Sequence, residues 1–188
     1  MRGSTYLGGM AALFLACAPV AGQQVVDFTA VVRRVQPAVV TLRTFDGSGR
    51  PLGVASGFVV EGGRVVTNAH VVDGASRVEV YGAKDELLGK AEHLEALSPA
   101  ADLAVLPPLR GVPAGLPLAE GDPEVGEAIL AIGSPRGLTH TVSDGLVSAM
   151  REMDGRRWIQ ISAPISEGSS GGPVLNRKGE VVGVSVAV

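Results

Sequence analysis

Residues 166–173 read Ser166-Glu167-Gly168-Ser169-Ser170-Gly171-Gly172-Pro173. A serine flanked by glycines can expose its hydroxyl and turn nearby backbone N–H groups in one direction. An acyl-transfer nucleophile needs both, the hydroxyl for attack and the amides to hold an oxyanion. Clusters of glycine and serine are more often plain turns. A catalytic interpretation therefore requires a base and an orienting acid elsewhere in the chain.

The candidate general base is His70, one of three histidines in the chain. It follows Thr67-Asn68-Ala69, where an apolar strand is expected to end in a small turn. A rigid strand end holds a base in position, and position matters before pKa. The alternative is a structural histidine whose ring nitrogens are satisfied. Neither His93 nor His140 has ligand-like spacing to a histidine or cysteine, so we expect no metal site and no cofactor.

The candidate orienting acid is Asp102, directly before the apolar run Leu103-Ala104-Val105-Leu106. A carboxylate at the start of such a strand is costly to bury unless it accepts hydrogen bonds, and a histidine N–H would supply one. The alternative is a turn aspartate that caps residues 98–101. The order His70, Asp102, Ser170 is that of the chymotrypsin arrangement, whereas subtilisins and α/β-hydrolases order their triads differently.

The composition is typical of a globular protein built from short strands. The 188 residues suffice for one domain or two small ones, and 46% hydrophobic against 19% charged residues exclude global disorder. With 26 glycines and little helical periodicity, the chain is predicted to be all-β. The net charge of −3 does not indicate a positively charged surface that would bind nucleic acid, so we expect no nucleic-acid partner.

The predicted strands lie on both sides of a proline-rich linker, residues 107–117, which cannot form a central strand. We predict an N-terminal β-barrel over 23–106 and a C-terminal β-barrel over 118–188. A short helix is expected near residues 27–35, with Asp27 as N-cap and Pro37 as its stop. Strand-like runs are 39–43, 56–60, 64–67 and 77–81 before the linker, and 128–132, 141–148, 158–163 and 180–188 after it. The alternation of charged and apolar side chains in residues 77–81 predicts that one face of this strand is exposed to solvent.

Residues 1–22 have the pattern of a secretory signal peptide, with Arg2, an apolar stretch over 7–17 and small residues before a cleavage point. The apolar stretch is too short to span a bilayer, so we expect no membrane span. Lipid anchoring at Cys17 is disfavoured because Phe14-Leu15-Ala16 is a poor lipoprotein signal. Cleavage would leave no cysteine, which favours export to a bacterial periplasm, or secretion, over a eukaryotic secretory route.

Six motifs resemble those of HtrA/Deg-type trypsin-like serine peptidases, and the resemblance extends from the predicted helix to the C-terminus. They are Ser56-Gly57-Phe58-Val59-Val60, Thr67-Asn68-Ala69-His70-Val71-Val72, Asp102-Leu103-Ala104-Val105-Leu106, Ala131-Ile132-Gly133-Ser134-Pro135, Asp144-Gly145-Leu146-Val147-Ser148-Ala149 and Gly168-Ser169-Ser170-Gly171-Gly172-Pro173. The resemblance implies the chymotrypsin fold of two six-stranded β-barrels, polypeptide substrates and, in many members, a homotrimer.

The resemblance also implies roles for individual residues. Ser170 would be the nucleophile, His70 the general base and then acid, and Asp102 the residue that orients the imidazole. The N–H groups of Gly168 and Ser170 would form the oxyanion hole, and a glycine can adopt the angles that aim its amide inward. Pro164 and Ile165 would form the base of the S1 pocket. Since neither is acidic, we expect small or medium aliphatic residues there rather than Lys or Arg.

The sequence departs from the family pattern at several positions, none of them in the triad. Ser169, Ser162 and Arg136 replace a common asparagine, aspartate and phenylalanine. The chain stops at Val188 inside an apolar run, and no PDZ domain is recognised. We therefore expect a second barrel that lacks a strand, with an exposed edge at 180–188.

Two functions remain open from the sequence. The first is a serine endopeptidase that acts on unfolded or damaged envelope proteins. The second is a non-catalytic module of the same fold that binds polypeptides as a scaffold or holdase. The complete set of candidate triad residues favours the first, because a binding module does not need them, and the truncated end keeps the second open.

Overall fold

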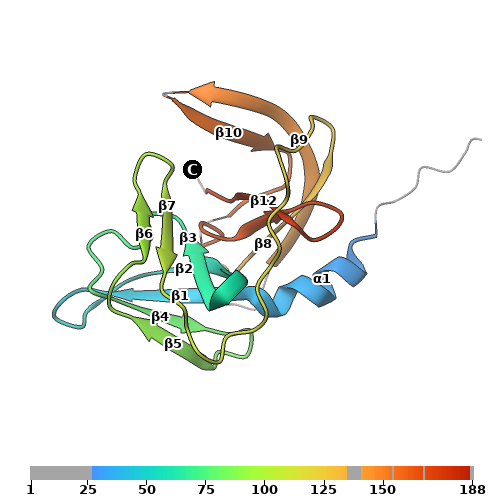
Figure 1. Cartoon of the computed structure of the whole chain (residues 1–188). Coiled ribbons are helices and arrows are strands. Elements are labelled where there is room, and N and C mark those ends of the chain that lie inside the picture. The colour runs from blue at the N-terminus through green and yellow to red at the C-terminus, as the bar shows by residue number, and fades with distance from the viewer. Residues whose placement is uncertain (1–26, 135–140, 154, 167, 187–188) are drawn as a thin grey trace, which may run out of the picture.

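The computed structural model describes residues 27–134, 141–153, 155–166 and 168–186. Two curled antiparallel sheets form two half-barrels that pack side by side, with one short α-helix beside them (Figure 1). The predicted all-β fold with two barrel-like units and a short N-terminal helix is confirmed. In the described part the sheets have seven and five strands rather than six each. The predicted signal peptide with Cys17, together with Arg136 and His140, lies outside the described residues.

The helix α1 spans Thr29–Val35, within the predicted range of 27–35, and its N-cap is Phe28 rather than the predicted Asp27. The Asp27 carboxylate accepts a hydrogen bond from the Thr29 N–H at 2.9 Å, so it satisfies one of the free donors at the helix start. After Val35 the chain tightens into a 3₁₀ turn, η1, over Gln36–Ala38. Pro37 lies in this turn and has no N–H with which to continue the helix. Within the described residues, no helix is long and apolar enough to cross a bilayer.

The first sheet has the order β5-β4-β1-β2-β3-β7-β6. Its strands are β1 Val39–Phe45, β2 Pro51–Val60, β3 Arg64–Thr67, β4 Arg77–Tyr81, β5 Leu87–Ala91, β6 Ala96–Ser98 and β7 Leu103–Leu106, with the 3₁₀ turn η2 Glu61–Gly63 between β2 and β3. Strand β3 pairs with β7 in antiparallel register, with Thr67 opposite Ala104. This pairing brings the segment after β3 next to the residue before β7.

The second sheet has the order β10-β9-β8-β11-β12, so β10 and β12 are its edges. Its strands are β8 Ala128–Gly133, β9 Thr141–Met153, β10 Arg156–Ile161, β11 Pro173–Leu175 and β12 Val181–Val184. Strand β8 is buried along its whole length. Leu130 and Ile132 pack into the core of the first sheet, whereas Ile129 and Ala131 pack inside the second. This strand therefore forms the wall that the two half-barrels share.

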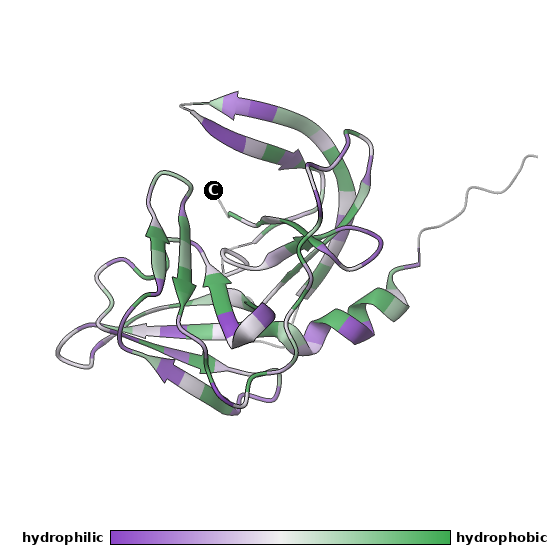
Figure 2. Ribbon diagram, viewed as in Figure 1, coloured by the Kyte–Doolittle hydropathy of each residue, from purple (hydrophilic) through white to green (hydrophobic). Residues whose placement is uncertain are grey.

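Hydrophobic and hydrophilic residues are distributed unevenly over the strands (Figure 2). Figure 2 shows hydrophobic residues along β7 and β8, and hydrophilic residues toward the far end of the β9–β10 hairpin. The segment between β7 and β8 runs across both sheets. The Leu116 N–H donates to the Val59 carbonyl, and the Pro117 carbonyl accepts from the Val181 N–H, each at 2.8 Å.

The prediction of a solvent-exposed face over residues 77–81 is wrong, because the three central residues of β4 are buried. Glu79 is only 8% exposed. Its carboxylate contacts the Lys90 ammonium on β5 at 2.8 Å and accepts a hydrogen bond from the Tyr81 hydroxyl at 2.8 Å. These two partners hold the pKa of Glu79 below its usual value. Side-chain pairing across the β4–β5 hairpin, rather than water, satisfies the charge.

Candidate active site

The pairing of β3 with β7 brings His70 and Asp102 together. His70 lies three residues after the end of β3, and Asp102 lies one residue before β7. The His70 Nδ1 atom is 2.8 Å from Asp102 Oδ2, and the backbone N–H of His70 donates to Oδ1 at 3.0 Å. Because an ionised carboxylate only accepts hydrogen bonds, Nδ1 carries the proton and Nε2 is left as the acceptor. One carboxylate thus fixes both the position and the tautomer of the imidazole.

The backbone of Asp102 is held in an uncommon conformation. Its φ of 52° lies in the left-handed region, which aspartate tolerates better than most residues with a side chain. The Asn68 side-chain amide donates to the Asp102 carbonyl at 3.0 Å, and Asn68 is 1% exposed. The Asp102 side chain is itself 17% exposed, whereas that of His70 is 49% exposed. The candidate acid is thereby largely covered, while the candidate base is about half exposed.

The Gly168–Gly172 loop presents Ser170 from the second half-barrel. The Ser169 N–H donates to the Ser166 carbonyl at 3.0 Å, and the Gly172 N–H donates to the Ser169 carbonyl at 2.9 Å, so the loop consists of successive tight turns. Gly168 and Gly171 have φ values of 88° and 85°, which favour glycine. The local sequence therefore folds this way because its glycines stand where the turns require positive φ.

His70, Gly168 and Ser170 line one cavity of about 290 Å³. The remaining lining comes from the first sheet and the turn after β3: Thr44, Leu52, Gly53, Val54, Ala55, Val71 and Asp73. His70 from one half-barrel and the loop of Ser170 from the other thus line the same cavity. A carbonyl bound in this cavity would meet a hydroxyl, an imidazole and glycine-loop amides, the groups that acyl transfer uses.

The two residues predicted for the S1 pocket, Pro164 and Ile165, are not among the residues that line this cavity. Ile165 packs against the core of the second sheet, and Pro164 is exposed. The Pro164 carbonyl accepts a hydrogen bond from the Ser143 hydroxyl at 2.7 Å. Neither side chain lines the cavity of His70 and Ser170. Their role in specificity stays a prediction.

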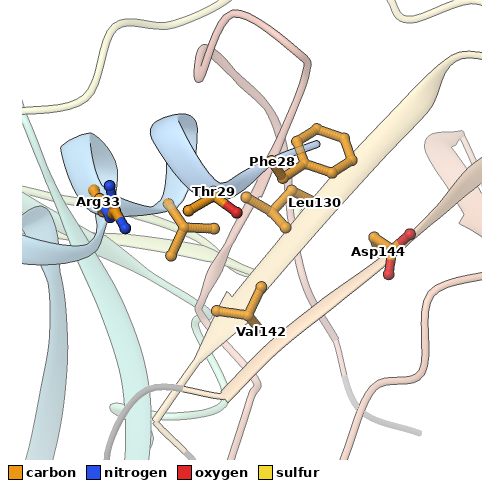
Figure 3. Close-up of a pocket in the computed structure, with 7 residues that line it drawn as sticks. Phe28, Thr29, Arg33, Leu130, Val142 and Asp144 are labelled. Atoms are coloured by element: carbon orange, nitrogen blue, oxygen red, sulfur yellow. The ribbon is translucent and has the colours of Figure 1, made fainter. Parts of the chain in front are cut away.

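A larger hollow of about 570 Å³ lies between α1 and strands β8 and β9 (Figure 3). Figure 3 shows Phe28, Leu130 and Val142 along it, with Arg33 and Asp144 at opposite sides. Of the described residues that line it, none belongs to the candidate triad. We therefore place the chemistry in the smaller cavity.

Two residues around the site carry hydrogen bonds that the sequence did not predict. Ser56 and Asn68 were noted only as parts of motifs, yet they bind the Gly168 and Asp102 carbonyls respectively. One signal was visible for Ser56, a single hydroxyl within the otherwise apolar run of residues 54–60. Buried polar side chains in such runs are normally hydrogen-bonded, so this serine required a partner.

Comparison with known proteins places the chain in a family. The trypsin-like peptidase domain matches residues 55–184. The chain belongs to the trypsin-like peptidase family. Its peptidase domain is 36% identical over 174 residues to the mitochondrial serine protease HTRA2 of Bos taurus, covering 82% of this chain and 37% of that protein. It is 40% identical over 151 residues to a DegP-like periplasmic serine endoprotease of Brucella suis, covering 76% and 29%.

Solved structures agree with this family. The peptidase domain superposes on the crystal structure of a serine endoprotease from Yersinia pestis with a TM-score of 0.72 and 30% identity, over 86% of this chain and 58% of that one. The HtrA/Deg-type resemblance and the chymotrypsin-like fold are thereby confirmed. The chain spans about a third of the length of the two curated relatives.

Proposed function

We propose that this chain is a serine endopeptidase that cleaves polypeptides through an acyl-enzyme on Ser170. The observation that carries the proposal is that His70, held by Asp102 through a 2.8 Å contact, lines the same cavity as Ser170 and Gly168. The names of the relatives, which are serine proteases and endoproteases, support the same reaction.

The mechanism follows from the tautomer that Asp102 imposes. His70 Nε2 takes the proton from the Ser170 hydroxyl as its oxygen attacks the substrate carbonyl carbon. The N–H groups of Gly168 and Ser170 would hold the resulting oxyanion. The C–N bond then breaks, and the imidazolium gives its proton to the leaving amine. Water, deprotonated by His70, attacks the acyl-enzyme and releases the carboxylic acid and the free serine.

The first test is hydrolysis of casein and of short chromogenic peptides by wild type and Ser170→Ala. We expect wild type to cleave both and the variant to lose at least about 10⁴-fold in kcat. Ser169→Ala is the matched control, because it removes the neighbouring hydroxyl and leaves the proposed nucleophile in place. Binding of unfolded casein without cleavage by either protein would instead favour the scaffold or holdase function.

We also infer that the protein works outside the cytoplasm, in a bacterial envelope, on unfolded or damaged proteins. The DegP-like relative from Brucella suis is named as periplasmic, which supports export of this chain. Expression of the full chain should yield a periplasmic form whose N-terminus begins near residue 23. Recovery of the full-length chain in the cytoplasm alone would contradict export.

Mild acid should abolish activity, because a protonated His70 cannot accept the Ser170 proton. Activity should therefore fall as the pH is lowered below neutral. The measurement is kcat/KM on a peptide without titratable groups. An activity that does not fall as the pH is lowered would exclude His70 as the base.

Pro164 and Ile165, which we propose for the base of the S1 pocket, predict which residue is preferred before the cleaved bond. Burying a cationic side chain beside Ile165 without a partner would be costly, so aliphatic P1 residues should be preferred. Para-nitroanilide peptides ending in Val or Ala should be cleaved with kcat/KM at least about tenfold above the matched Arg peptide. Fastest cleavage after Arg would show that the specificity pocket is built from other residues.

A further inference from the structure

We propose that Ser56 is a positioning residue that fixes the proposed oxyanion loop from the opposite half-barrel. The inference rests on the proposed function and adds a residue that acts through Gly168 rather than on the substrate. Ser56 lies on β2 of the first sheet and is fully buried, while Gly168 lies in the second half-barrel. Its side chain therefore connects two parts of the fold that the sequence separates by 112 positions.

The side chain of Ser56 makes two short hydrogen bonds into the second half-barrel. Its Oγ donates to the Gly168 carbonyl at 2.6 Å and accepts from the Ser134 N–H at 2.7 Å. A hydroxyl has a single proton, so the two bonds use it as donor and acceptor in a fixed orientation. The Ser134 amide thus directs the Ser56 proton toward Gly168.

The backbone of Ser56 holds the other end of the loop. Its N–H donates to the Ser170 carbonyl at 2.9 Å, and its carbonyl accepts from the Thr67 hydroxyl at 2.8 Å. Thr67 is the last residue of β3, the strand that leads to His70. One residue therefore binds the carbonyls of Gly168 and Ser170, whose amides are the proposed oxyanion donors, and links them to the strand that positions the base.

These bonds fix a peptide unit that would otherwise be free to turn. The Gly168 carbonyl and the Ser169 N–H belong to one planar unit, bound by Ser56 at one end and by the Ser166 carbonyl at the other. Gly168 has no Cβ to restrict its dihedrals, so hydrogen bonds must do so. Without the Ser56 hydroxyl the carbonyl would lose this donor, and rotation at Gly168 would move its N–H away from the oxyanion.

The test compares Ser56→Ala with Thr41→Val. The Thr41 hydroxyl also connects the half-barrels, 2.5 Å from the Ser134 hydroxyl, and is buried. Among the described residues its side-chain hydrogen bond goes to Ser134 and not to residues 168–172. We expect Ser56→Ala to lower kcat by at least about tenfold with KM within about threefold, because the loss concerns the transition state. Affinity for a peptide aldehyde, which forms an oxyanion, should fall in parallel with kcat. Thr41→Val should keep kcat within about twofold.

The outcomes separate this inference from the proposed function. An active wild type with an unchanged kcat in Ser56→Ala overturns the inference alone. Equal losses in Ser56→Ala and Thr41→Val also overturn it, since they would show a general effect of packing between the sheets. A wild type that cleaves nothing overturns the proposed function and this inference with it. Should Ser56→Ala not fold, Ser56→Cys decides, because a thiol is a weaker donor and a wild-type kcat in that variant would exclude the role.

Discussion

Asp102→Asn should lower kcat by about 10⁴-fold while the protein remains folded. Both carboxylate oxygens are engaged by His70, Oδ1 by its backbone N–H and Oδ2 by Nδ1. In the variant, the amide oxygen must face the backbone N–H, because two donors cannot bind each other. The amide NH₂ then faces Nδ1 and makes it the acceptor, which moves the ring proton to Nε2. A protonated Nε2 cannot accept the Ser170 proton, so the base is lost with little change in shape.

The measurement is kcat on a chromogenic peptide, with circular dichroism to establish folding. Asn is compatible with the left-handed φ of 52° at this position, so backbone strain should not add to the effect. Asp73→Asn is the matched control: Asp73 lines the cavity of His70 and Ser170, and the substitution makes the same change of charge. We expect its kcat to stay within about threefold of wild type, since only a screened charge is lost. Comparable losses in both variants would show that cavity charge, rather than the His70 tautomer, sets the rate.

Gly171→Ala should have the largest effect on stability. A Cβ at residue 171 would lie 2.2 Å from the Ser56 carbonyl oxygen and 2.2 Å from the Thr67 hydroxyl, both in the buried junction between the half-barrels. The φ of 85° adds the strain of a left-handed conformation. Together these should lower the free energy of unfolding by roughly 2–5 kcal/mol, a large part of a typical total of about 5–15 kcal/mol. Urea unfolding followed by tryptophan fluorescence measures the change.

The control Gly49→Ala separates the cost of a left-handed backbone from the cost of a steric clash of the added Cβ. Gly49 has a similar φ of 83°, but an added Cβ would have open space around it. We expect this control to lose only about 1–2 kcal/mol, the cost of the left-handed conformation. Equal losses in the two variants would mean that the junction at Gly171 can relax and that close packing there is not needed.

The fold was predictable because its determinants are local. Proline and glycine positions marked the turns and the connector, and short apolar runs marked strands such as β3 and β8. The order of His70, Asp102 and Ser170 along the chain indicated a candidate triad. The pairing of β3 with β7 explains why His70 and Asp102 lie in contact. The solvent-exposed face predicted from the alternating pattern of residues 77–81 was wrong, because a charged face can be covered by partners on the next strand. Lys90 belongs to a hairpin that periodicity cannot place opposite Glu79.

The hydrogen bonds that hold the site could not be predicted in the same way. Ser56 and Gly168 lie in different half-barrels, and their contact depends on how the two sheets pack. The Asn68 amide binds the carbonyl of Asp102, whose backbone has a positive φ that the pattern of side chains does not predict. Sequence motifs therefore supplied the candidate chemical groups, while the packing of one sheet on the other determines how those groups are held.

Phosphonylation by a fluorophosphonate tests the central claim most directly, because this reagent reacts with activated serine hydroxyls. The measurement is intact mass followed by peptide mapping of wild type and Ser170→Ala. We expect one adduct on wild type, located at Ser170, and none on the variant. An unlabelled but folded wild type, or an adduct at Ser169 that persists in Ser170→Ala, would contradict the assignment of Ser170 as the nucleophile.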